Sequence, residues 1–341
     1  MRRLTVATIK DVAKECGVSV TTVSLIINGK AKERRISEKT CERVHTAMKK
    51  LGYRPNAGAR ALRASDDARP IIAFFWPNDN RSGMQGDFLG HFQNVLTELN
   101  YDAKIVAESY TSGKLEKAGA PITSASYSAV IIGACTPEDI LWLESQSPRI
   151  PVVLMNRDSN VFSTICSDNE EIGMSAARLI KLAGYNEVAV LTSTRPYVAT
   201  GVRVRAFLNA CKTLDIKVRD EWIIKNENSI EGGVKAAEVY CNLPDRPQMV
   251  YADSDSMAVG ALYTFYNHGL KLPDDVALLA IALRNKGITE YSIPPCTVVA
   301  MPSKKIAKSC IETIRTILAA PEKAPIHVVI EPEVIVRQTF R

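Results

Sequence analysis

The chain of 341 residues exceeds one ordinary domain and is 46% hydrophobic, so it can bury one large core or two linked ones. Its net charge of +6 is distributed unevenly along the chain. Residues 1–64 carry 15 Lys and Arg against 5 Asp and Glu, a net of +10, and the other 277 residues carry −4. A phosphate backbone attracts such a basic segment, and the acidic remainder argues against general binding of polyanions by the whole chain. No export signal or membrane-length apolar run is present, so we expect a cytoplasmic protein without a membrane partner.

Residue types with catalytic or metal-binding chemistry form no recognisable set. The eight cysteines include no CxxC pair and the four histidines are scattered, which predicts reduced thiols and no zinc site. The chain has no GxGxxG motif, no P-loop and no nucleophile with an adjacent base. The sequence therefore predicts neither an enzyme nor a cofactor, although a fold alone can never exclude an enzyme.

Residues 8–28 have the pattern of two short helices joined by a tight turn. Thr8 can cap the first helix, Gly17 can end it, and Ser19 can cap the second. A third amphipathic helix follows, opened by Ser37. Apolar residues at helical spacing predict one small core shared by the three helices: Ile9, Val12, Ala13, Val23, Ile26, Ile27, Val44, Met48 and Leu51.

The second helix leaves its first turns exposed, at Val20, Thr21, Ser24 and Leu25. In a helix-turn-helix motif, the N-terminal residues of the second helix meet base edges in the major groove. Three ordinary amphipathic helices of a larger domain would explain the pattern alone equally well. The charge surplus of the same segment favours DNA binding.

This segment resembles the headpiece of the LacI/GalR family of bacterial transcription regulators, through its DVA, GVS and TVS triplets and Asn28. The run from Leu51 to Asn56, followed by Leu62, is similar to the family's hinge helix, expected at about residues 55–63. The match is close over residues 8–63 and looser beyond. It implies contacts to operator DNA by Thr8, Ser19, Val20, Thr21, Thr22, Ser24, Leu25, Asn28, Arg34, Arg35, Tyr53, Asn56, Ala59 and Leu62.

The hinge is expected to become helical only on DNA. Pro55 pushes the preceding residue out of the helical region, Asn56 can cap the short helix, and Gly58 weakens it. A helix of about eight residues with an internal glycine is too short to form alone in water. By resemblance, Leu62 inserts between base steps from the minor groove and kinks the operator. A leucine that merely packs on the next domain is the alternative.

Two features depart from the family pattern. The loop of residues 29–35 looks longer than usual and is basic, with Arg34 and Arg35 either reaching a phosphate or solvating the surface. The base-reading positions Val20 and Leu25 are apolar. Such side chains touch thymine methyl groups but cannot bond bidentately to guanine, which predicts a preference for A·T pairs.

A polar link at residues 65–70 separates the small all-α helix-turn-helix headpiece, residues 1–64, from a predicted core of residues 70–341. Apolar runs alternate there with amphipathic helical segments, which is typical of parallel sheets covered on both faces. The order resembles the family's periplasmic-binding-protein-like α/β core, two doubly wound parallel-sheet subdomains around a ligand cleft. The predicted strands are 71–76, 104–106, 129–132, 151–155, 188–191, 248–251, 276–281, 326–330 and 334–336.

Effector contacts are implied by the same resemblance. Arg203 matches an arginine that binds an effector's carboxylate or hydroxyls, and a salt-bridged helix residue is the alternative. Ser254 stands where an asparagine often meets the ligand, and for the adjacent Asp255 we expect mainly a helix-capping role. Ala282 replaces a hydroxyl-binding aspartate, and alanine accepts no hydrogen bond. Any effector is therefore expected to be anionic or only partly polar.

The whole pattern favours a homodimeric repressor that binds a pseudo-palindromic operator and responds to a small-molecule effector. No heptad segment follows the last predicted strands, so we expect dimers and not tetramers. Two other classes remain open. An exported ligand-binding protein would explain the core alone, and an enzyme on an α/β scaffold would explain neither headpiece nor hinge.

Overall fold

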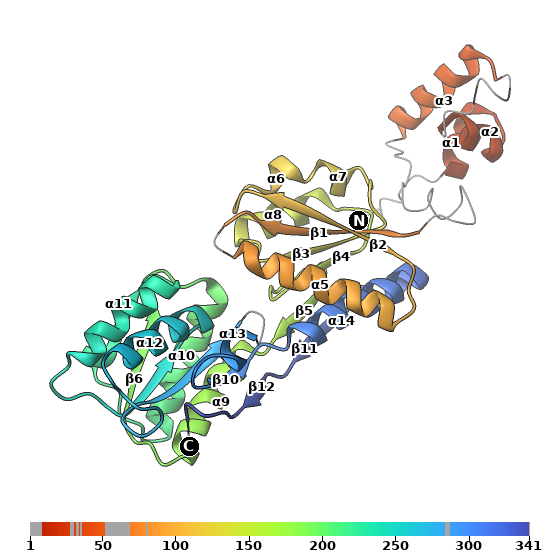
Figure 1. Ribbon diagram of the computed structural model, residues 1–341. Helices are drawn as coiled ribbons and strands as arrows, with labels where there is room; N and C mark the ends of the chain where they lie inside the picture. Colours follow the sequence, from red (N-terminus) through yellow and green to blue (C-terminus); the bar gives the residue numbers. More distant parts are fainter. Residues whose placement is uncertain are drawn as a thin grey trace.

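The computed structural model describes residues 9–27, 31, 34, 36–51, 69–79, 81–283 and 287–340. The hinge at residues 55–63 lies outside these ranges, as do the predicted DNA contacts Thr8, Asn28, Arg35, Tyr53, Asn56, Ala59 and Leu62. Figure 1 shows that the described core consists of two α/β lobes. None of the described helices combines the length and the hydropathy that crossing a bilayer requires.

The headpiece contains the three predicted helices, α1 (Ile9–Cys16), α2 (Val20–Ile27) and α3 (Glu38–Lys50). Gly17 ends α1 with a φ of +63°, in the left-handed region that glycine adopts at no steric cost. The Ser37 hydroxyl accepts a hydrogen bond from the Thr40 backbone N–H at 3.3 Å, which confirms Ser37 at the start of α3. The helices bury one cluster of side chains: Val12, Ala13, Cys16, Val23, Ile26, Val44 and Ala47.

The first lobe is built on a parallel sheet with the order β11-β5-β4-β3-β1-β2. Alternate residues of β1 face opposite sides: Phe74 packs with α5 and α14, and Phe75 packs with α6, α7 and α8. The strands are β1 (Ile71–Pro77), β2 (Lys104–Tyr110), β3 (Ala129–Gly133), β4 (Val152–Met155), β5 (Ser163–Ser167) and β11 (His327–Ile330). The helices are α5 (Ser82–Glu98), α6 (Leu115–Ala118), α7 (Ala120–Thr123), α8 (Pro137–Gln146) and α14 (Ser303–Ala319).

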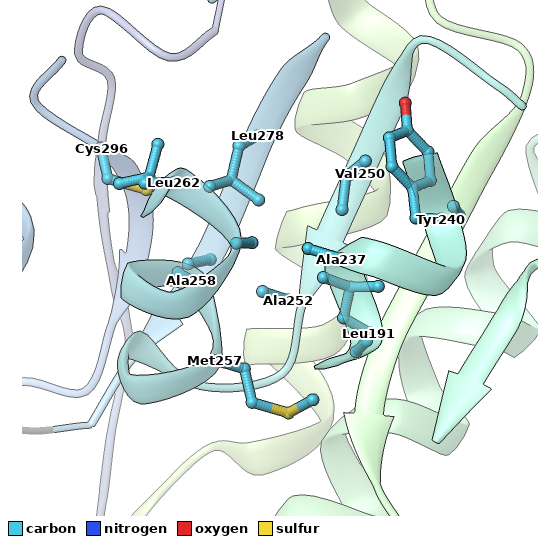
Figure 2. Close-up of a cluster of buried hydrophobic side chains, with 14 of the residues drawn as sticks. Leu191, Ala237, Tyr240, Val250, Ala252, Met257, Ala258, Leu262, Leu278 and Cys296 are labelled. Atoms are coloured by element: carbon cyan, nitrogen blue, oxygen red, sulfur yellow. The ribbon is translucent and has the colours of Figure 1, made fainter. Parts of the chain in front are cut away.

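The second lobe has the sheet order β12-β10-β9-β8-β6-β7. Helices α9 and α10 cover one face, and α11 and α12 cover the other, where Tyr240, Val250 and Met257 pack together (Figure 2). The strands are β6 (Val188–Ser193), β7 (Ile223–Asn226), β8 (Met249–Ala252), β9 (Ala277–Ala282), β10 (Thr297–Ala300) and β12 (Glu333–Ile335). The helical segments are α9 (Asn169–Leu182), α10 (Val198–Thr213), η1 (Asp220–Trp222), α11 (Ile230–Cys241), α12 (Asp255–Asn267), α13 (Gly287–Glu290) and, after α14, η2 (Pro321–Lys323).

The chain passes between the lobes three times, after β5, after β10 and after β11. Helix α14 follows β10 of the second sheet yet packs beside α5 on the first lobe (Figure 1). Neither lobe is therefore one continuous stretch of sequence. Because only three short segments join the lobes, the lobes can move relative to one another at these crossings.

The structure corrects the predicted sheets in two respects. Strand β12 pairs antiparallel with β10, so the second sheet is not wholly parallel. Strands β5, β7 and β10 were absent from the prediction. They are four or five residues long, and polar residues such as Ser163 and Lys225 interrupt the apolar pattern of β5 and β7. Such short strands form because neighbouring strands supply their partners, which a local pattern does not reveal.

Candidate functional site

The helix-turn-helix exposes the start of α2. The Ser19 hydroxyl accepts a hydrogen bond from the backbone N–H of Thr22 at 3.0 Å, which confirms Ser19 as the N-cap. Val20 is 40% exposed, and Thr21 is exposed beside it. The first turn of α2 therefore offers small apolar and hydroxyl-bearing side chains to a partner. The other described contacts predicted on this helix are half-buried: Thr22, Ser24 and Leu25.

Helix α3 holds the helix-turn-helix through contacts with α1. The guanidinium of Arg43 donates to the carbonyl of Cys16, the last residue of α1, and so satisfies an end-of-helix carbonyl. Lys50 lies 2.6 Å from Glu15 in an exposed ion pair. Arg34, in the basic loop before α3, is exposed. Part of the positive charge thus stabilises the headpiece, and part remains at its surface.

A second candidate site is a cavity of about 120 Å³ between the two lobes. Ligands of open α/β sheets bind beyond the carboxyl ends of the strands, and several lining residues follow strands β1, β4 and β8. The three predicted effector residues all line this cavity. Its walls include Trp76, Arg81, Phe88, Asn156 and Arg157 of the first lobe and Tyr197, Arg203, Asn228, Ser254, Asp255 and Leu283 of the second.

Arg203 is buried in the wall of the cavity, with 3% of its surface exposed. Its Nε donates to the side-chain oxygen of Asn169 at 2.9 Å, and in the described part of the chain it makes no salt bridge. The alternative prediction, that Arg203 forms a salt bridge on its helix, is therefore not supported among the described residues. Burial lowers the pKa of the guanidinium to about 10, so Arg203 is protonated at neutral pH.

Close helix packing holds Arg203 in place. A Cβ atom at Gly173 of α9 would overlap the backbone carbonyl of Arg203 on α10, so only glycine permits this approach. One turn further along α10, Phe207 stacks on Tyr251 with ring centroids 3.9 Å apart. The backbone that carries Arg203 is thus pressed against the sheet by its neighbours.

Ser254, and not Asp255, caps α12. The Ser254 hydroxyl accepts a hydrogen bond from the backbone N–H of Met257 at 3.2 Å and donates to the side-chain oxygen of Asn228 at 2.7 Å. The predicted capping role of Asp255 is therefore wrong, because Asp255 is already the first helical residue. Its carboxylate instead accepts a hydrogen bond from the backbone N–H of Leu283 at 3.2 Å.

Ala282 ends β9 and is 2% exposed. Leu283, the next residue, lines the cavity, and Ala282 does not. This part of the wall therefore presents an apolar side chain and no carboxylate.

Two arginines of the first lobe were missed by the sequence reasoning. Arg157 lies just after β4, beyond Asn156, whose φ of 51° turns the chain. Its Nε donates to the carbonyl of Cys135, and its Nη1 donates to the carbonyl of Asn156 at 2.6 Å. A position just past a predicted parallel strand was the available signal, since such positions line ligand sites.

Arg81 reaches from the first lobe to the second. It forms an ion pair with Asp79, whose Oδ1 accepts from Nε at 3.0 Å, and its guanidinium lies 4.1 Å from the ring centroid of Tyr197. Tyr197 directly precedes α10 of the other lobe. This cation–π contact bridges the cleft.

Burial keeps two of the thiols protonated. All eight cysteines are unpaired, and burial raises the pKa of Cys135 to about 11 and that of Cys211 to about 12. Neither is therefore a thiolate at neutral pH. Within the described ranges, no three His, Cys, Asp or Glu residues are grouped as a metal site requires.

Family models and whole-chain relatives match both parts of the molecule. The model for bacterial regulatory proteins of the lacI family matches residues 8–56, and the model for the periplasmic binding protein-like domain matches residues 176–340. The HTH-type transcriptional repressor PurR of Vibrio vulnificus is 28% identical over 98% of this chain and 99% of its own length. The probable HTH-type transcriptional repressor ExuR of Bacillus subtilis is 26% identical over 98% of each chain.

Solved structures agree with these matches. A LacI family transcription regulator from Clostridium acetobutylicum superposes with a TM-score of 0.76 at 29% identity, over 79% of this chain and 100% of that one. The lac repressor dimer bound to operator shares the fold over 98% of this chain and 99% of its own, with a TM-score of 0.68 at 18% identity. Together with these relatives, the helix-turn-helix headpiece and the two-lobed core identify a DNA-binding transcription regulator and not an enzyme. The chain belongs to the LacI family of bacterial regulatory proteins.

Proposed function

We propose that this regulator acts as a repressor in the cytoplasm, binding a pseudo-palindromic operator as a homodimer under the control of a small-molecule effector. The observation that carries the proposal is the exposed first turn of α2 on a headpiece segment with a net charge of +10. Relatives that match almost the full chain are named as repressors, which supports the same direction of control.

The headpiece, assigned to residues 1–64, makes three kinds of DNA contact in this proposal. Val20, Thr21 and Leu25 meet base edges in the major groove, preferentially at A·T pairs, and Arg34 meets a phosphate. The paired hinges insert Leu62 at the centre of the operator. The other predicted DNA contacts come from the remaining residues: Thr8, Ser19, Thr22, Ser24, Asn28, Arg35, Tyr53, Asn56 and Ala59.

The core, assigned to residues 70–341, supplies the dimer contact. Two headpieces are needed for a palindromic site, so a second copy of this chain is the partner. Large apolar side chains are exposed on and near α12 in the second lobe: Tyr263 at 61%, Tyr266 at 79%, Tyr291 at 80% and Ile293 at 90%. An exposed apolar surface of this kind is typical of a protein interface.

An effector in the cleft meets Arg203, Ser254 and Asp255 and favours one arrangement of the lobes. The headpieces and hinges precede the first lobe in the chain, so a change between the lobes alters the spacing of two hinges in a dimer. The effector binds one arrangement of the lobes more tightly than the other. This difference sets how far the effector can change the affinity of the protein for the operator.

Operator titration tests the proposal. The full chain should bind DNA from upstream of its own gene more tightly than random duplex, with log K falling by about 0.9 per phosphate contact for each unit of log salt. Sedimentation should give a dimer. Leu62→Ala should weaken both binding and bending, because unstacking the central base step depends on the wedge.

The control for this variant is Leu141→Ala, which truncates a leucine of the core that is 65% exposed. It should leave operator binding, bending and thermal unfolding unchanged. Equal affinity for random duplex, or affinity that ignores salt, would contradict the proposal. Unchanged bending in Leu62→Ala would return that leucine to a packing role.

A further inference from the structure

Two arginines face the same cavity from opposite lobes. Arg157 extends from the end of β4 in the first lobe, and Arg203 extends from α10 in the second. Their charges are close enough to interact: burial is the main cause of the lowered pKa of Arg203, and repulsion by Arg157 lowers this pKa further. Like charges on the two walls oppose closure of the lobes.

Most hydrogen-bond donors of Arg203 have no protein acceptor. A guanidinium carries five N–H donors in a fixed planar fork. Although Arg203 is almost completely buried, the described residues supply an acceptor only to its Nε, at Asn169. Arg157 uses Nε and Nη1 on backbone carbonyls, and its Nη2 has no acceptor in the described ranges. Both side chains line the cavity, so their remaining N–H donors can bond an acceptor from outside the chain.

Other charges around the cavity are already engaged. Arg81 is paired with Asp79 and lies over Tyr197. Asp255 accepts from the backbone N–H of Leu283. Asp253 precedes the lining residue Ser254 and is 1% exposed, and burial raises its pKa. Its Oδ2 accepts from the Thr192 hydroxyl at 2.6 Å and the Ser193 N–H at 2.9 Å, whereas its Oδ1 has no hydrogen-bond partner among the described residues. Both carboxylates attract Arg203 from a distance, but neither is bonded to it in a salt bridge.

The cavity suits a small molecule. A volume of about 120 Å³ corresponds to roughly ten waters at about 10–15 Å³ each. A ligand of roughly ten non-hydrogen atoms fills it, and planar oxyanions match the guanidinium fork bidentately.

We propose that the effector is a compact anion whose carboxylate or phosphate group is clamped between Arg157 and Arg203, so that its charge draws the two lobes together. Its control of operator binding rests on the function proposed above, whereas anion binding in the cleft does not. The anionic member of a matched ligand pair should therefore bind the cleft more tightly than the neutral member.

Calorimetric titration of the full chain at constant ionic strength tests the clamp. Succinate and succinamide have the same size and shape and differ in charge. Glycerol 3-phosphate supplies a phosphate, with glycerol as its neutral counterpart. We expect one or both anions to bind, and the neutral compounds to bind at least tenfold more weakly. Binding of one anion alone identifies carboxylate or phosphate as the recognised group.

Arginine variants locate the site, because the basic headpiece also attracts anions. Arg157→Gln and Arg203→Gln should each weaken anion binding at least tenfold. Arg205→Gln is the matched control: Arg205 lies on the same helix as Arg203, is exposed, and lines no part of the cleft. Should Arg203→Gln fail to fold, the half-buried Arg157 provides the same test from the other lobe.

Three results would overturn the clamp: no preference for anions over their neutral counterparts, anion binding that survives loss of both cleft arginines, or equal loss in Arg205→Gln. Operator titration separates this inference from the proposed function. Arginine-dependent anion binding without operator binding supports the clamp and contradicts the repressor. Operator binding without anion binding in the cleft does the reverse.

Discussion

The headpiece and the core are stabilised on different scales. The buried cluster of the headpiece contains only small and aliphatic side chains, of which Ile26 is among the largest. The second lobe buries aromatic side chains between a sheet and its helices, with Phe207 stacked on Tyr251. Each buried side chain of the headpiece therefore supplies a large share of the buried surface there. The helix caps and turns contribute a correspondingly larger share of the stability of the headpiece. The headpiece therefore depends more on caps and turns, and the core more on the burial of large side chains from distant segments.

The largest effect is expected from Phe207→Ala in the core. Phe207 is fully buried, and its removal should lower the free energy of unfolding by about 3–5 kcal/mol. Chemical denaturation followed by the fluorescence of Trp222, which is buried in the same lobe, measures the loss. Leu182→Ala, at a site that is 84% exposed, should change stability by no more than about 0.5 kcal/mol. A loss below about 1 kcal/mol in Phe207→Ala would show that the cavity collapses and that packing here is not rigid.

A smaller loss of stability in the headpiece should have a greater effect on DNA binding than the larger loss in the core. Ile26→Ala removes a side chain that is 6% exposed and should cost about 2 kcal/mol, a large part of what so small a core supplies. We expect the headpiece to unfold below the transition of the core, with loss of operator binding and an unchanged signal from Trp222. Ile230→Ala, at an isoleucine that is 49% exposed in the core, is the control. A single transition shifted as a whole would instead mean that headpiece and core unfold together.

The same difference explains how much the sequence predicted. The caps at Ser19 and Ser37 and the turn at Gly17 were predicted correctly, because each depends on residues within one helical turn. Continuous apolar runs also identified most strands. The strands that were missed, such as β5 and β10, owe their conformation to neighbours brought from elsewhere in the chain.

The cleft was predicted only in part, for the same reason. Arg203 and Ser254 were found because they lie in motifs shared with the family, and the cavity brings them together. Arg157 and Arg81 lie in no such motif, and the only signal for Arg157 was its position just past a predicted strand. Their position in the cavity follows from the strand order of the first lobe and from the crossings between lobes, which no short segment encodes.

The smallest effect is expected from removing the same kind of N-cap in the headpiece and in the core. Ser19 caps α2 by accepting from the Thr22 N–H at 3.0 Å, and Ser229 caps α11 by accepting from the Gly232 N–H at 2.9 Å. Ser19→Ala and Ser229→Ala should each cost about 1 kcal/mol, since each leaves one helix N–H without its acceptor.

Equal free energies should nevertheless shift the two melting temperatures unequally. The entropy of unfolding grows with the number of residues that unfold together, so about 1 kcal/mol lowers the midpoint by about 4–8 °C in a domain of 60–100 residues and by less in a larger one. Ser19→Ala should therefore lower the headpiece midpoint more than Ser229→Ala lowers that of the core, and Ser19→Thr should recover most of the loss because threonine also caps. Calorimetry of the full-length variants measures both midpoints. A larger shift in the core than in the headpiece would mean that the headpiece does not unfold as a separate small unit, and the contrast between the two regions would be wrong.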